Sequence, residues 1–342
     1  MTITVNSEQA YDLLVDCIQA QKVPMLTGQP GTGKSSIVKL IAKVFNLQLI
    51  DMRLSQCDPT DLSGFPQIDS ESGKASYMPM STFPLETDAI PKGKSGWLLF
   101  LDEFNSAPLA VQAASYKLVL DRMVGLHKLH PNTAIICAGN LDTDNAIVNR
   151  MSTAMQSRLV HIELVVNTDI WLNWAATADI DHRVKSYINF KPNILQNFDP
   201  DHNDKTFACA RTWEFVSDFI KKWGEIPKEK LPLLAGTIGE GVAREFMGFC
   251  KIYQNLPTIQ DIIKSPLTTK MPTEPSTLYA ISGSLAHNAN NDNSKPIVEF
   301  IERMPLEFQV ITLKDIRVGN PEMKDNPDIT SWCVRNATAL MG

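Results

Sequence analysis

The chain has 342 residues, long enough for two domains, and its 44% apolar and 20% charged residues are typical of a folded protein with a substantial core. Its formal net charge of −6 argues against a broad surface for nucleic acid or for an anionic membrane, although a local basic groove would escape this argument. The six cysteines lack CxxC spacing and the six histidines lack an HExxH pair, so we expect free thiols and no zinc site.

Two kinds of membrane-directed segment are missing from the sequence pattern. No window approaches the ~18 consecutive apolar residues that suggest a transmembrane helix. The N-terminal sequence MTITVNSEQA lacks the basic and apolar regions of a signal peptide. We therefore expect a cytoplasmic protein that does not enter a membrane.

The first part of the chain alternates between predicted helices and strands. A helix is predicted over 7–21, with Ser7 as the candidate cap. The other predicted elements are strands over 23–28, 47–54, 97–101, 133–140 and 159–166, and helices over 35–45 and 108–123. Strands that alternate with helices over about 160 residues indicate a parallel α/β domain.

The pattern becomes mostly helical after residue 167. Helical spacing is found over 169–178, 210–226, 234–253, 275–289 and 295–304, and 288–295 is predicted to be a loop. We therefore predict an α/β domain over 1–166, with a long insert at about 55–96, and a helical lid and C-terminal extension over 167–342.

A glycine-rich segment follows the strand predicted over 23–28. GQPGTGKS (28–35) matches G-x-x-x-x-G-K-[ST] without a mismatch and opens a predicted helix, as the P-loop mechanism requires. Its glycines let backbone N–H groups and the helix N-terminus face phosphate oxygens. We expect Lys34 to contact the β- and γ-phosphates and the Ser35 hydroxyl to bind Mg²⁺. The residues predicted to bind the nucleotide are Gly28, Gln29, Pro30, Gly31, Thr32, Gly33, Lys34, Ser35 and Ser36.

Two acidic residues end the apolar strand WLLFL (97–101). In P-loop NTPases a second apolar strand supplies an acid that holds Mg²⁺. We assign this role to Asp102. Glu103 would act as the general base that polarises the attacking water. The alternative is a strand that ends in a solvated acidic turn. We favour the first interpretation because the P-loop motif precedes this strand in the chain, and Mg²⁺ and Lys34 would offset the two negative charges.

These motifs, with AGN at the end of the fourth predicted strand and MQSRLVHIEL after it, resemble the ring-forming AAA+ ATPases. DPTDLSGFP (58–66) resembles the sequence that precedes an inserted hairpin in the MoxR-type group, which places that hairpin over 67–80. The resemblance covers about 1–165 and continues more weakly into ARTWEFVS (210–217). It implies a P-loop NTPase fold, a three-layer core with a parallel sheet, followed by a helical lid.

The resemblance also implies roles for single residues. Asn140 would be sensor 1, Arg158 an arginine finger that reaches a neighbour's γ-phosphate, and Arg211 sensor 2 in the lid. Arg150 is a second candidate for the contact between subunits. A turn asparagine or a surface arginine remains the alternative for each. Ser106 stands where many members have arginine, which puts one intersubunit contact in doubt.

The function implied by the resemblance is Mg²⁺-dependent ATP hydrolysis in a hexameric ring that remodels or activates a partner protein. Members of the group often act with a partner that has a von Willebrand factor A domain. Two alternatives remain open: a nucleic-acid-stimulated motor or restriction-type NTPase, and a nucleotide-dependent scaffold with little turnover. His127, Lys128 and His130 could face a ring pore or form a solvated hairpin.

Overall fold

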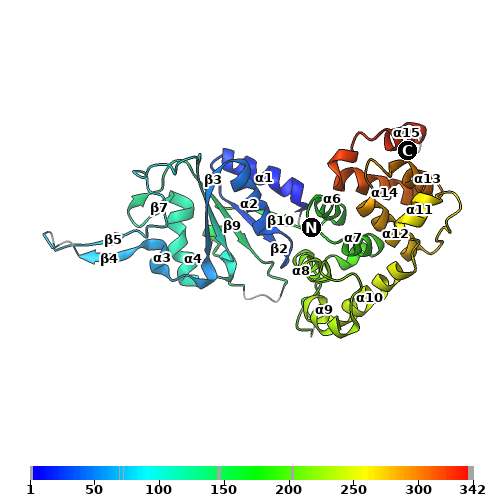
Figure 1. Cartoon of the computed structure of the whole chain (residues 1–342). Coiled ribbons are helices and arrows are strands. Elements are labelled where there is room, and N and C mark those ends of the chain that lie inside the picture. The colour runs from blue at the N-terminus through cyan, green and yellow to red at the C-terminus, as the bar shows by residue number, and fades with distance from the viewer. Residues whose placement is uncertain (1–2, 69, 72, 145–147, 202–203, 338–342) are drawn as a thin grey trace. The chain divides into compact units, whose positions relative to one another are not determined.

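The computed structural model describes residues 3–68, 70–71, 73–144, 148–201 and 204–337. The chain divides into two compact units (Figure 1). Unit 1 comprises Met1–Val166 and Asp199–His202, and unit 2 comprises Asn167–Phe198 and Asn203–Gly342.

Unit 1 is built on a parallel sheet. Within the described residues the sheet has six strands in the order β1-β10-β2-β9-β6-β3, and every neighbouring pair is parallel. The strands are β1 (Thr4–Val5), β2 (Pro24–Gly28), β3 (Leu47–Arg53), β6 (Gly96–Asp102), β9 (Thr133–Gly139) and β10 (Val160–Leu164). Only the two-residue edge strand β1 was not predicted, because two residues give no periodic pattern.

Helices cover both faces of this sheet, so the predicted three-layer P-loop fold is confirmed (Figure 1). Helices α1 (Ser7–Gln19) and α2 (Lys34–Val44) share a core with Leu98 and Phe100 of β6. Helix α4 (Leu109–Tyr116) packs on the other face, in the core that contains Leu99 and Leu101. Successive side chains of β6 therefore point into opposite cores, and all four are fully buried. Burying each such side chain contributes about 1.5–3 kcal/mol to stability.

Two helix ends differ from the prediction. Asn6, and not Ser7, caps α1: its Oδ1 accepts a hydrogen bond from the Gln9 amide at 2.9 Å, and the Gln9 side chain accepts one from the Asn6 amide at 3.1 Å. The helix predicted over 108–123 leaves α-helical geometry at Tyr116 and continues as a π-helical turn over Lys117–Asp121. It ends at Arg122, whose φ of 55° is left-handed.

The insert contains a short helix, α3 (Pro59–Ser63), and an antiparallel hairpin of β4 (Phe65–Ile68) and β5 (Ala75–Met78). We call this hairpin the arm; Figure 1 shows it extending from unit 1. It begins two residues before the predicted range 67–80, of which residues 69 and 72 lie outside the described part. All eight strand residues of the arm are exposed. A smaller hairpin, β7 (Met123–Val124) and β8 (His127–Lys128), follows the π-helical turn.

Unit 2 is mostly helical over its described residues, as predicted. Its helices are α6 (Thr168–Thr177), α7 (His182–Phe190), α8 (Ala210–Ile220), α9 (Leu231–Ile238), α10 (Glu240–Cys250), α11 (Ile259–Lys264), α12 (Pro275–Asn288), α13 (Ser294–Ile301), α14 (Leu306–Gly319) and α15 (Pro327–Arg335). The single helical segment predicted over 234–253 is wrong, because Gly239 adopts a φ of 85° and separates α9 from α10. Across the described residues, no helix combines the length and the apolar character needed to cross a bilayer.

Candidate nucleotide-binding site

The P-loop connects β2 to α2 at the edge of the sheet where the parallel strands end. Gly31 and Gly33 have left-handed φ angles of 79° and 90°, which glycine adopts without strain. A Cβ on Gly28 would lie 2.7 Å from the carbonyl oxygen of Leu164, so the close approach of β10 also requires glycine. The Thr32 hydroxyl donates to the Gln29 carbonyl at 2.9 Å and closes the turn. The loop therefore has the curvature that the motif predicts, and α2 begins directly after it.

The Lys34 side chain folds back over this loop. Its Nζ donates to the carbonyl oxygens of Gly28 at 2.5 Å and Gln29 at 3.0 Å. It also donates to Asn140 Oδ1 at 3.3 Å. Because β9 lies beside β2 and ends at Gly139, Asn140 emerges next to the P-loop. The structure thus brings two of the predicted site residues, 106 positions apart, into direct contact.

Ser35 and Asp102 form the next contact of the site. The Ser35 hydroxyl donates to Asp102 Oδ2 at 3.2 Å, so the end of β6 lies against the first turn of α2. A hydroxyl and a single carboxylate fit Mg²⁺, which proteins often hold with one or two carboxylates while phosphates and water complete the octahedron. The described residues hold no cluster of three or more His, Cys, Asp or Glu side chains that could bind a metal alone.

Glu103 has an unusual backbone and a defined partner. Its φ of 54° and ψ of 34° are left-handed, which costs a residue with a side chain about 1 kcal/mol. Its carboxylate accepts a hydrogen bond from the Ser55 hydroxyl, which follows β3, the strand beside β6. Backbone strain of this kind gathers at functional sites. Both acids lie at the strand ends, beside the P-loop.

Three residues near this edge were not predicted from the sequence: Ser55, Asn105 and Asp144. Ser55 binds Glu103, and buried Asn105 binds the backbone of Asn140. Burial raises the pKa of Asp144, while the Leu141 amide and the positive charge of Lys34 act in the opposite direction. Asn105 stands in LLFLDEFNSAP, one of the segments that carry the resemblance, but no role was predicted for it. Ser55 and Asp144 stand in no such segment, and their place at the site is shown only by contacts between separate strands or loops.

The three predicted arginines lie elsewhere. Arg158 is exposed, and its Nη1 donates to the Ala154 carbonyl at 2.9 Å, after the short helix α5 (Thr153–Gln156). In the parallel register Val160 pairs with Pro24, whereas Leu164 pairs with Gly28. Arg158 therefore precedes the start of β10, about 13 Å or more along the sheet from the P-loop. The chain's own nucleotide site is out of its reach.

Arg150 and Arg211 are also exposed. Arg150 follows Asn149 in the segment after β9. Arg211 is the second residue of α8 in unit 2. The structure does not test their predicted roles, which stay predictions.

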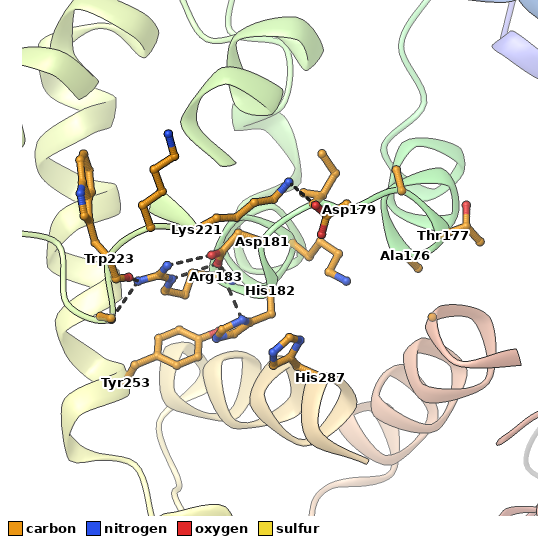
Figure 2. Close-up of a pocket in the computed structure, with 16 residues that line it drawn as sticks. Ala176, Thr177, Asp179, Asp181, His182, Arg183, Lys221, Trp223, Tyr253 and His287 are labelled. Carbon is orange, nitrogen blue, oxygen red and sulfur yellow. Dashed lines mark hydrogen bonds and ion pairs between the residues drawn. The ribbon is translucent and has the colours of Figure 1, made fainter. Parts of the chain in front are cut away.

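A polar cavity of about 690 Å³ lies within unit 2 and contains none of the predicted site residues (Figure 2). Asp181 and Arg183 form a buried ion pair at 2.8 Å, and Lys221 pairs with Asp179 at 2.9 Å. Arg183 also donates to the backbone carbonyls of residues 220, 223 and 224. The buried guanidinium is therefore matched by groups of the same unit, which indicates a structural cluster.

Part of unit 1 is similar to a known family of domains. Residues 24–159 match the sequence model of the AAA domain (dynein-related subfamily). Among solved structures, a provisionally assigned ATPase from Cytophaga hutchinsonii shares 14% identity with a TM-score of 0.36, covering 91% of this chain and 81% of that one. A RuvB mutant from Thermotoga maritima shares 16% identity with a TM-score of 0.40, covering 82% and 83%.

Proposed function

We propose that unit 1 hydrolyses ATP with Mg²⁺, and that a ring of subunits uses the hydrolysis to remodel or activate a partner protein, as the MoxR-type resemblance implies. One observation carries the proposal: Lys34, Ser35 with Asp102, Glu103 and Asn140 converge at the edge where the parallel strands end. Ligands of open α/β sheets bind at this edge.

Each residue has a separate task in the proposed reaction. Lys34 would exchange its bonds to the loop carbonyls for phosphate oxygens of ATP. Ser35 and Asp102 would hold Mg²⁺, which when bound neutralises charge on the phosphates. Glu103 would accept the proton of the attacking water, and the Asn140 amide would orient that water. The Ser55 hydroxyl donates a hydrogen bond to the Glu103 carboxylate. This bond must therefore break, or leave a carboxylate lone pair available, before Glu103 can accept the proton.

The position of Arg158 supports a site completed by a neighbouring subunit. It is exposed and lies at the opposite end of β10 from the P-loop, which leaves it accessible to another copy of the chain. An arginine supplied in this way stabilises charge that develops on the transferred phosphoryl group. In this proposal 167–342 serves as lid and extension, with Arg211 contacting the nucleotide.

The arm is our candidate contact for the client protein. Four of its large apolar side chains are exposed: Phe65, Ile68, Tyr77 and Met78. Phe65 and Met78 lie opposite each other on one face of the hairpin, and Ile68 and Tyr77 lie on the other face, so both faces offer apolar side chains to a partner. A client with a von Willebrand factor A domain is implied by the resemblance alone.

The test is the variant Glu103→Gln, which keeps the shape of the side chain and removes the base. We expect it to bind Mg·ATP as the wild type does and to release phosphate at least about tenfold more slowly. Wild-type turnover in this variant would remove Glu103 from the mechanism. Stimulation of wild-type turnover by DNA would favour the nucleic-acid motor, and absence of turnover in the wild type would favour the scaffold.

A further inference from the structure

Asn105 holds the backbone of Asn140 on both sides. It lies in the short 3-10 turn Phe104–Ser106, two residues after Glu103, and is only 3% exposed. Its Nδ2 donates to the Asn140 carbonyl oxygen at 2.7 Å, and its Oδ1 accepts from the Asn140 amide at 3.2 Å. Both ends of one buried side-chain amide are thus bound to a single residue at the tip of β9.

Gly139 makes this contact possible. A Cβ at position 139 would lie 2.1 Å from Asn105 Oδ1 and 2.7 Å from the side-chain carbon of the same amide. Real Cβ atoms do not come so close, and the amide is fixed by its two hydrogen bonds. Asn105 and Gly139 therefore form one unit, in which the missing side chain leaves room for the amide.

We propose that Asn105 is a positioning residue that orients the Asn140 side chain for ATP hydrolysis. With its backbone N–H and C=O both held, Asn140 can change only its two side-chain torsions, and its Oδ1 already accepts from Lys34 at 3.3 Å. Small errors in the placement of a catalytic group are costly to rate. This inference rests on the proposed function, because Asn140 must act in the reaction for its orientation to matter.

The same residue links the acid turn to the segment before Arg150. The Asn105 carbonyl accepts from the Asn149 amide at 2.7 Å, and Asn149 Nδ2 donates to the Ala107 carbonyl at 2.9 Å. The turn after Glu103 is therefore hydrogen-bonded both to Asn140 and to Asn149, the residue before the exposed Arg150. Asn105 is the residue that makes contacts to both.

A double-mutant cycle on ATP turnover tests the proposal. Asn105→Asp keeps the size of the side chain but places an oxygen where the donor faces the Asn140 carbonyl. We expect kcat to fall by about tenfold or more, with less than about a threefold change in the Kd for Mg·ATP. In an Asn140→Ala background the same substitution should cost less than about threefold, because the side chain that it orients is gone. Asn132→Asp, at an exposed position directly before β9, should leave kcat unchanged.

Two results would overturn the proposal: a wild-type kcat in Asn105→Asp, or the same fold-loss in both backgrounds. A second variant, Asn105→Ser, removes both hydrogen bonds without adding charge and is put through the same cycle if Asn105→Asp does not fold. Failure of the proposed function looks different. There the wild type releases no phosphate, or Glu103→Gln has no effect, whereas failure of this inference leaves both of those results as expected.

Discussion

The nucleotide edge of unit 1 and the polar cavity of unit 2 both gather charged side chains, but they hold them differently. In unit 1, Lys34 is bound by backbone carbonyls and by the Asn140 side chain, and Asp102 by a hydroxyl. In unit 2, Arg183 pairs directly with Asp181 in a bidentate ion pair and fills its remaining donors with carbonyls.

The difference shows how to recognise a site of chemistry. Neutral partners can be exchanged for a phosphate or for Mg²⁺, since the incoming ligand replaces each hydrogen bond that is lost. A buried ion pair cannot be opened in this way, because each charge would be left unpaired in a medium of low polarity. The unit 2 cavity therefore serves stability, although it is roomy and lined with charged groups.

The largest expected effect on turnover comes from Arg158, which would complete the unit 1 site of a neighbouring subunit. Arg158→Ala should lower turnover by about a thousandfold, equivalent to about 4 kcal/mol in the barrier, and leave the Kd for Mg·ATP unchanged. Phosphate release measures the first quantity and calorimetry the second. Mixing this variant with Glu103→Gln should restore up to about a quarter of the wild-type activity, because some interfaces regain both groups. If no mixing ratio restores activity, the arginine does not act between subunits.

Breaking the ion pair of unit 2 should affect stability and not nucleotide binding. Arg183→Ala leaves Asp181 buried without its partner, so we expect a loss of about 3–5 kcal/mol in the free energy of unfolding. Lys221→Ala is the control: its partner Asp179 is 98% exposed, and the loss should stay below about 1 kcal/mol. Denaturant titration measures both, with the Kd for Mg·ATP measured on the folded protein. Equal losses in the two variants would contradict the structural role of the buried pair.

His182, which lines the same cavity, should make the stability of the protein depend on pH. Burial lowers the pKa of His182 to about 4, with the His287, Arg183 and Lys185 charges acting in the same direction and Asp181 opposing. The imidazole takes up its proton near pH 6.5 in the unfolded chain. Above that pH His182 is neutral in both states, and its contribution to the free energy of unfolding is complete. It is lost as the pH falls toward 4, by about 3 kcal/mol in total.

The measurement is the difference in unfolding free energy between the wild type and His182→Gln from pH 7 to pH 4. Burial raises the pKa of Asp315 to about 6, and this gives a slope of opposite sign. That slope is present in both proteins and cancels in the difference. A difference that does not change with pH would show that His182 is protonated as readily in the folded chain as in the unfolded one.

The sequence was most informative where one segment carries the whole signal. The P-loop, the acid doublet and the long apolar strands are each continuous in the chain, so their pattern predicts both the fold and the nucleotide edge. Helices α7, α11, α14 and α15 were not predicted, and α9 and α10 were merged because a single glycine does not reveal its φ in advance.

The contacts that set the site geometry could not be predicted. Ser55 lies 48 residues from Glu103, and Asn105 lies 35 residues from Asn140. Their partners are chosen by strand register, which brings the end of β3 beside β6 and the end of β6 beside β9. Serine and asparagine are common in turns, so their identity alone carries no such information.

The most direct test of the account is the stoichiometry of Mg·ATP binding, measured by calorimetry on the full chain. We predict one nucleotide per chain in the wild type and at least about a hundredfold weaker binding in Lys34→Ala, which removes the phosphate contact. Lys221→Ala, in the unit 2 cavity, should bind as the wild type does. A wild-type chain that binds no nucleotide at saturating Mg·ATP, or a Lys34→Ala variant with unchanged affinity, would contradict the central claim.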